Sequence, residues 1–148
     1  MGDKGGYIPP CSWDMGLSLA GGTLFGSGLS GLGVTGFCYG GGVTNYLAAA
    51  LGEEMQAGVP YYGVAPVAAS VANIEAPLLC HLAEHDERVN STYPAFESAL
   101  KAGGVPYQRY VYPGTQHGFH NDSTPRYDEA AAKLSWTRTV AHFKRHLV

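Results

Sequence analysis

Charged residues are scarce in this sequence of 148 residues, where they make up 14 %, and none occurs between Met15 and Gly52. The formal net charge of −3 gives no reason to expect nucleic-acid binding, which depends on basic surfaces. Hydrophobic residues make up 45 %, and this excludes an intrinsically disordered chain. The length suits a single domain.

A long apolar run and a secretory signal are also absent. Glycines interrupt the first half of the uncharged stretch, so it lacks the roughly 20 apolar residues of a membrane helix. The start, MGDKGGYIPP, has no apolar segment behind its lysine, unlike a signal peptide. Cysteine is rare, with only Cys11, Cys38 and Cys80. We therefore expect free thiols, a reducing cytoplasmic compartment and no membrane association.

Glycine, by contrast, is abundant, with 21 residues. Residues 1–30 contain Pro9-Pro10 and a stretch rich in glycine and serine. This composition disfavours a helix and favours irregular backbone. We leave this segment unassigned as a glycine-rich N-terminal part, and we expect residues 31–148 to hold the regular secondary structure.

Strands and helices alternate from Gly33 onward. Strands are predicted at 33–37, 59–62, 76–84 and 106–114, and helices at 41–52, 91–104 and 124–148. This order predicts an α/β fold in which helices flank a mostly parallel sheet. The last helix is expected to begin at Thr124-Pro125 and to bury one apolar stripe, formed by Trp136, Val140, Phe143 and Leu147.

The sequence Gly36-Phe37-Cys38-Tyr39-Gly40 has the form G-x-nucleophile-x-G of a nucleophile elbow, a sharp turn between a strand and a helix. Small residues must flank the nucleophile, because side chains there would clash across the turn. The positive end of the helix dipole is expected to lower the pKa of the Cys38 thiol. The backbone N–H of Tyr39 would then face a developing oxyanion.

Two further polar residues follow predicted strands. Asp86 lies in the segment AEHDERVN and His117 in YPGTQHGF. Catalytic residues of parallel sheets gather beyond the carboxyl ends of the strands, and the order nucleophile, acid, histidine is that of α/β-hydrolases. We therefore predict that Cys38 attacks a carbonyl group, that His117 moves its proton, and that Asp86 orients His117.

Three segments, GFCYGGG, HLAEHDERVN and YVYPGTQHGFHND, together with the last helix, resemble the dienelactone hydrolase family. The resemblance runs from about Gly33 to the C-terminus. It implies an α/β-hydrolase fold, a Cys-Asp-His triad at Cys38, Asp86 and His117, and hydrolysis of small esters or lactones without a cofactor or metal.

The family's fold opens with several strands and helices before the elbow, for which this sequence has about 32 residues. The resemblance places a second oxyanion N–H and a substrate-binding arginine in that part, and a further arginine where Asn121 stands here. Without it, Val34–Phe37 becomes an exposed apolar edge. Residues 1–30 would cover this edge, or a second copy would pair with it in a homo-oligomer, or the fold would be marginal.

Simpler interpretations stand beside the catalytic one. Cys38 could be an inert buried thiol, Asp86 a turn residue and His117 a loop histidine. A zinc site is also considered, because four histidines lie within residues 81–120: His81, His85, His117 and His120. Their spacing, however, matches no metal-binding motif. The alternative to an enzyme is a non-catalytic remnant or association module that retains the triad residues.

Overall fold

The computed structural model describes residues 17–21 and 31–147. Its centre is one five-stranded sheet in which the strands lie in chain order. The last four strands are mutually parallel. The strands are β1 (Leu17–Gly21), β2 (Leu32–Phe37), β3 (Met55–Tyr61), β4 (Leu78–His85) and β5 (Tyr107–Gln116).

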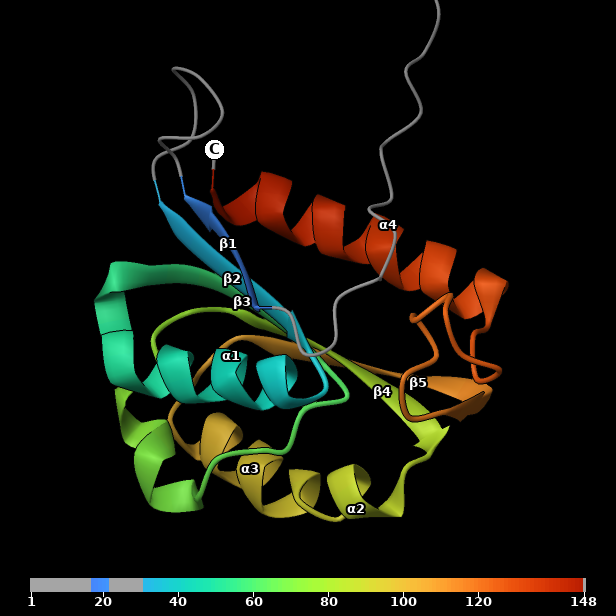
Figure 1. Cartoon of the computed structure of the whole chain (residues 1–148). Helices are drawn as coiled ribbons and strands as arrows, with labels where there is room; N and C mark the ends of the chain where they lie inside the picture. Colours follow the sequence, from blue (N-terminus) through green and yellow to red (C-terminus); the bar gives the residue numbers. More distant parts are fainter. Residues whose placement is uncertain (1–16, 22–30, 148) are drawn as a thin grey trace, which may run out of the picture.

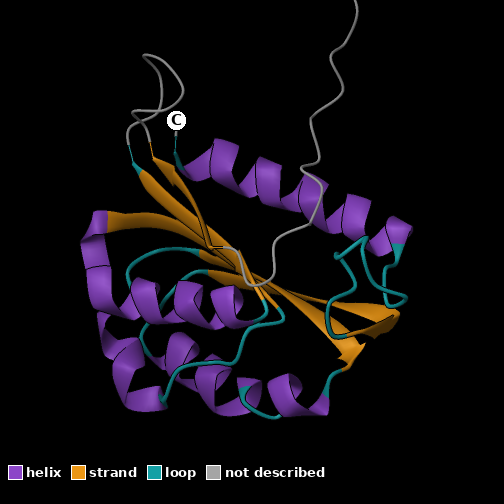
Figure 2. Cartoon of the chain, in the orientation of Figure 1, coloured by secondary structure: helices purple, strands orange, loops and turns teal. Residues whose placement is uncertain are grey.

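Helices cover both faces of this sheet (Figure 1). On one face lie α1 (Tyr39–Leu51), α2 (Glu87–Asn90) and α3 (Tyr93–Ala102), and on the other lies α4 (Glu129–His146). A short 3-10 helix, Gly52–Glu54, lies between α1 and β3, and a second one, Ala68–Asn73, lies between β3 and β4. The colouring by secondary structure in Figure 2 shows the three layers. The predicted α/β fold with a mostly parallel sheet is therefore confirmed.

β1 lies in the part of the sequence for which irregular backbone was expected. It pairs antiparallel with β2, with Leu17 opposite Gly36 and Gly21 opposite Leu32. β2 is therefore an inner strand. The edge at Val34–Phe37 is covered by the same chain, which was the first of the three alternatives; pairing with a second copy was another. A strand so short and rich in small residues is decided by its partner rather than by its own pattern.

The last helix begins later than predicted. It starts at Glu129, and the Asp128 carboxylate caps it by accepting a hydrogen bond of 2.8 Å from the Ala131 N–H. Thr124 and Pro125 lie in the preceding turns. An aspartate is as good an N-cap as a threonine, so the start of the helix at Glu129 agrees with its local sequence.

The helix face in deepest contact with the sheet also differs from the predicted stripe. Ala131, Ala132, Ser135 and Thr139 are buried, whereas three of the predicted residues, Trp136, Val140 and Phe143, are half-buried. Small side chains are needed here because large aromatic side chains rise from the sheet beneath α4. Thr139 Oγ1 lies 2.7 Å from the Tyr61 hydroxyl and 3.1 Å from His81 Nε2.

The sheet separates two hydrophobic cores. The core under α1 and α3 is mainly aliphatic, with two aromatic side chains at its α3 side. The core under α4 is richer in aromatic side chains and includes Tyr61, Tyr62, Tyr112 and Phe119. No helix within the described residues is long and apolar enough to cross a membrane.

Candidate active site

Cys38 occupies the single residue between β2 and α1. Its φ of 55° and ψ of −117° lie in a region that residues other than glycine rarely adopt, so the backbone is strained. Its N–H donates a hydrogen bond of 3.1 Å to the Tyr61 carbonyl. A Cβ on residue 36 would lie 2.3 Å from the Gly40 carbonyl oxygen. The local geometry is therefore that of a nucleophile elbow, and it requires glycine at position 36.

Two glycines let α1 begin against the end of β3. A Cβ on residue 41 would lie 2.4 Å from the Tyr61 carbonyl oxygen, and one on residue 63 would lie 2.1 Å from the Gly41 carbonyl carbon. Gly42, the next residue of α1, borders an open space beside Val64.

Asp86 and His117 form a hydrogen-bonded pair. The Asp86 carboxylate lies directly after β4, and its Oδ2 accepts a hydrogen bond of 2.5 Å from His117 Nδ1. Oδ1 accepts a longer bond, 3.4 Å, from the Val89 N–H at the start of α2. The Asp86 side chain is 6 % exposed and the His117 side chain 25 %. A buried carboxylate that holds one ring nitrogen fixes the orientation of the imidazole.

Aromatic packing connects this pair with the elbow. The Tyr62 and His117 ring centroids lie 5.0 Å apart, and Cys38 packs against the core cluster to which Tyr62 and Phe119 belong. Within residues 31–147 the structure describes no hydrogen bond between the Cys38 thiol and His117. The residues predicted as nucleophile, acid and base thus follow β2, β4 and β5 at the same edge of the sheet.

Burial raises the pKa of the Cys38 thiol above its ordinary value of 9.0. The Arg126 guanidinium opposes this shift, the Asp86 carboxylate adds to it, and Arg88 opposes it. The prediction of a lowered pKa at the helix N-terminus is therefore wrong for the resting protein, because desolvation disfavours the thiolate more strongly than nearby positive charge favours it. Cys38 rests as a thiol at neutral pH.

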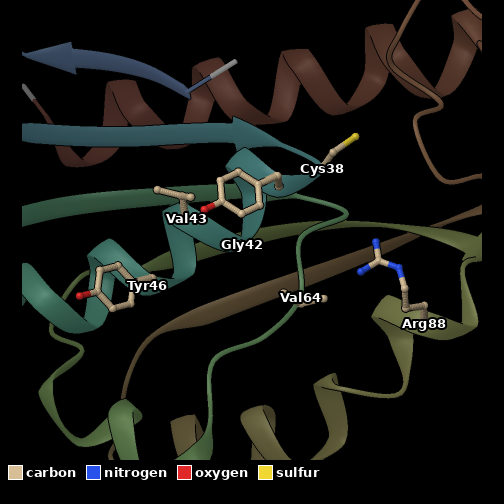
Figure 3. Close-up of a pocket in the computed structure, with 7 residues that line it drawn as sticks. Cys38, Gly42, Val43, Tyr46, Val64 and Arg88 are labelled. Carbon is tan, nitrogen blue, oxygen red and sulfur yellow. The ribbon is translucent and has the colours of Figure 1, made fainter. Parts of the chain in front are cut away.

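A cavity of about 480 Å³ opens beside Cys38. Figure 3 shows that the Cys38 side chain leaves the end of β2 and that the Arg88 guanidinium reaches up from α2 at the same end. The lining comprises Cys38, Tyr39, Gly42, Val43, Tyr46, Val64 and Arg88. Of these, sequence reasoning had missed Arg88, although it lies two residues after Asp86, and also Val43, Tyr46 and Val64, whose role depends on tertiary packing.

The histidines do not converge on a metal site. His81 is buried in the core under α4, where Nδ1 lies 2.9 Å from the Tyr112 hydroxyl. Burial lowers its pKa to about 3, so it is neutral at pH 7. In the described part of the chain, no group of three or more His, Cys, Asp or Glu side chains could hold a metal ion. The free thiols there are Cys38 and Cys80; Cys11 lies outside the described residues.

The chain is similar to known proteins of one family. The family model of the dienelactone hydrolase family matches residues 26–147. "Protein usf" of Aquifex pyrophilus is 38 % identical over 78 % of this chain and 52 % of its own length. A putative carboxymethylenebutenolidase of Aquifex aeolicus (strain VF5) is 34 % identical over the same shares.

A solved structure shows the same arrangement of elements. The crystal structure of a putative dienelactone hydrolase from Klebsiella pneumoniae superimposes with a TM-score of 0.70 and 29 % identity, over 77 % of this chain and 52 % of that one. The chain thus spans about half the length of the relatives it matches. Because the family model covers most of the sequence and the fold agrees, the chain belongs to the dienelactone hydrolase family.

Proposed function

We propose that this chain carries the catalytic residues of a hydrolase of small esters or lactones, with Cys38 as nucleophile, His117 as base and Asp86 as the group that orients His117. Residues 31–148 would be the C-terminal part of an α/β-hydrolase domain. The observation that carries the proposal is the hydrogen bond between Asp86 and His117 at the sheet edge where Cys38 sits on a strained elbow. Structural turns rarely combine such strain with a buried acid–imidazole pair.

The raised pKa of Cys38 sets the order of events. Because the raised pKa favours the thiol, the thiol proton passes to His117 as the sulfur attacks the carbonyl carbon. The C–O bond of the ester then breaks, and the protonated His117 gives its proton to the departing oxygen. Water attacks the resulting thioester with His117 again as base, which releases the acid and restores the thiol.

The oxyanion formed during each attack needs hydrogen-bond donors. Tyr39 is the first residue of α1, and the first N–H groups of a helix have no partner within it. We assign the Tyr39 N–H to the oxyanion because it follows the nucleophile directly. Asp86 stabilises the positive charge that His117 gains during transfer, as the carboxylate of a Ser-His-Asp triad does.

The substrate class rests on the family and on the cavity. Relatives of this chain are named as putative carboxymethylenebutenolidases, and a cavity of about 480 Å³ falls within the range of small-molecule sites. We therefore assign a small ester or lactone as substrate. A nucleophilic thiol must also stay reduced, and the free thiols of Cys38 and Cys80 favour a reducing compartment such as the cytoplasm.

The test is hydrolysis of p-nitrophenyl acetate by the purified chain and by three variants. Cys38→Ala and His117→Gln should each lower kcat/KM by about 10³-fold or more, since removing one member of a catalytic unit abolishes most of its effect. Cys80→Ala is the matched control: this thiol is buried in the other core, and its loss should leave kcat/KM unchanged. Equal rates for wild type and Cys38→Ala would refute the proposal and favour a non-catalytic remnant.

A further inference from the structure

The cavity beside Cys38 is a groove that follows one face of α1. Five of its lining residues are Cys38, Tyr39, Gly42, Val43 and Tyr46. Their spacing of i, i+1, i+4, i+5 and i+8 places them on the same side of the helix. The groove therefore runs from the nucleophile along α1 for roughly 12 Å at the rise of an α-helix. Figure 3 shows Gly42, Val43 and Tyr46 in this succession.

Gly42 keeps the middle of this groove open. A Cβ at that position would lie only 3.3 Å from Val64 Cγ2, so any side chain would narrow the space between α1 and the loop after β3. That loop is held firmly as the opposite wall. Asn45 Nδ2 donates to the Val64 carbonyl at 3.0 Å, and the Ala65 N–H donates to Thr92 Oγ1 at 3.0 Å.

The groove is polar at one end and apolar along the rest. Arg88 is the charged member of the lining, and it reaches toward the Cys38 end. Beyond it lie Val43, Val64 and two tyrosines, and the tyrosines are strongly exposed, 72 % for Tyr39 and 65 % for Tyr46. Apolar side chains that gather at the surface in this way mark a binding site.

We propose that this groove binds the apolar acyl group of an ester substrate, so that esters with an extended or aromatic acyl chain are preferred over acetates. The inference rests on the proposed function and adds its substrate class. His117 must give its proton to the leaving oxygen, so the leaving group lies on the His117 side. Neither His117 nor Asp86 lines the groove, which leaves the groove to the acyl group that stays bonded to Cys38.

A second copy of the chain could also cover exposed apolar side chains on α1. The groove, however, includes Cys38 in its lining and has the volume of a small-molecule site. An acyl chain uses both features, whereas a protein partner uses neither. We therefore assign the groove to the substrate, and light scattering distinguishes this from self-association.

The first test compares p-nitrophenyl acetate with p-nitrophenyl hexanoate. Each buried methylene group is worth about fourfold, so kcat/KM for hexanoate should exceed that for acetate by at least about tenfold in the wild type. Gly42→Val fills the groove and Tyr46→Ser shortens its wall, so both variants should reduce the hexanoate-to-acetate ratio of kcat/KM about fivefold or more. Leu134→Ser, at an exposed site on α4, is the matched control and should keep the wild-type ratio.

The second test needs no turnover, so it separates failure of the inference from failure of the proposed function. Hexanamide should slow alkylation of Cys38 by iodoacetamide in the wild type and in Leu134→Ser, but not in Gly42→Val or Tyr46→Ser. Protection together with a lack of ester hydrolysis would refute the catalytic proposal alone. No protection of the wild type, or a concentration-dependent dimer in light scattering that Tyr46→Ser abolishes, would overturn the groove assignment.

Discussion

At the scale of single residues, the elbow depends on glycines that touch backbone rather than on the cysteine itself. Gly36 lies so close to Gly40 that a Cβ would have to overlap the Gly40 carbonyl group. Backbone atoms of a helix start cannot move aside as a flexible side chain can. Only glycine fits at position 36, and this steric requirement is the reason why the pattern G-x-C-x-G could be recognised in the sequence.

Gly36→Ala should lower the free energy of unfolding by about 2–3 kcal/mol or more, because overpacking against backbone forces the turn open. Gly103→Ala is the control. Gly103 has a φ of −81°, which alanine readily adopts, and the added Cβ would lie 3.5 Å from the Ala99 carbonyl oxygen, an ordinary contact. The substitution should change stability by less than about 1 kcal/mol and in the stabilising direction. Urea unfolding measures both, and equal effects would contradict the steric argument.

The raised pKa of Cys38 should also be visible in the pH dependence of its alkylation. Alkylation of Cys38 by iodoacetamide should keep accelerating as the pH rises through 9.0, because only the thiolate reacts. Cys80 should stay unmodified in the folded protein, since it is 1 % exposed and burial raises its pKa to about 12. Peptide mass spectrometry resolves the two sites, and a Cys38 rate that levels off below pH 8 would contradict the prediction.

At the scale of elements, the position of α4 is decided by polar contacts that its sequence pattern does not reveal. The apolar stripe predicted a helix correctly, but the buried face holds Ser135 and Thr139. Thr139 connects α4 to the sheet through Tyr61 and His81. The hydrophobic period identifies a helix; hydrogen bonds to distant strands set its rotation, and such partners cannot be read from one segment.

Thr139→Val should therefore cost about 1–3 kcal/mol, because the variant keeps the shape but removes a hydroxyl from a buried hydrogen-bond network. Thr137→Val, on the same helix, removes an exposed hydroxyl bonded only to the Lys133 carbonyl, and its effect should stay within about 0.5 kcal/mol. Thermal unfolding of the two variants provides the comparison. A Thr139→Val variant as stable as the wild type would show that the network contributes nothing.

At the scale of the whole molecule, the two cores differ in kind, and this difference controls stability against pH. The core under α4 contains His81, fully buried with a pKa lowered to about 3. A histidine that is neutral when folded but charged when unfolded stabilises the fold fully above its unfolded pKa of about 6.5. That contribution is lost as the pH falls from there toward the folded pKa.

Below pH 6.5, His81 should therefore make stability fall by about 1.4 kcal/mol per pH unit. His81→Gln removes the titration, so its urea midpoint should depend less on pH between 7 and 4 than that of the wild type. His85→Gln, at an exposed position just past the buried part of β4, should follow the wild-type slope. Parallel slopes for His81→Gln and wild type would contradict a neutral buried His81.

The sequence by itself determined the α/β order, the elbow at Cys38 and the strand-end positions of Asp86 and His117, because each depends on local chemistry: hydrophobic period, glycine sterics and the direction of parallel strands. Tertiary structure alone decided the pairing of β1 with β2, the raised pKa of Cys38 and the groove between α1 and Val64. Pairing, burial and shape arise when distant segments meet, and no local pattern records which surfaces will do so.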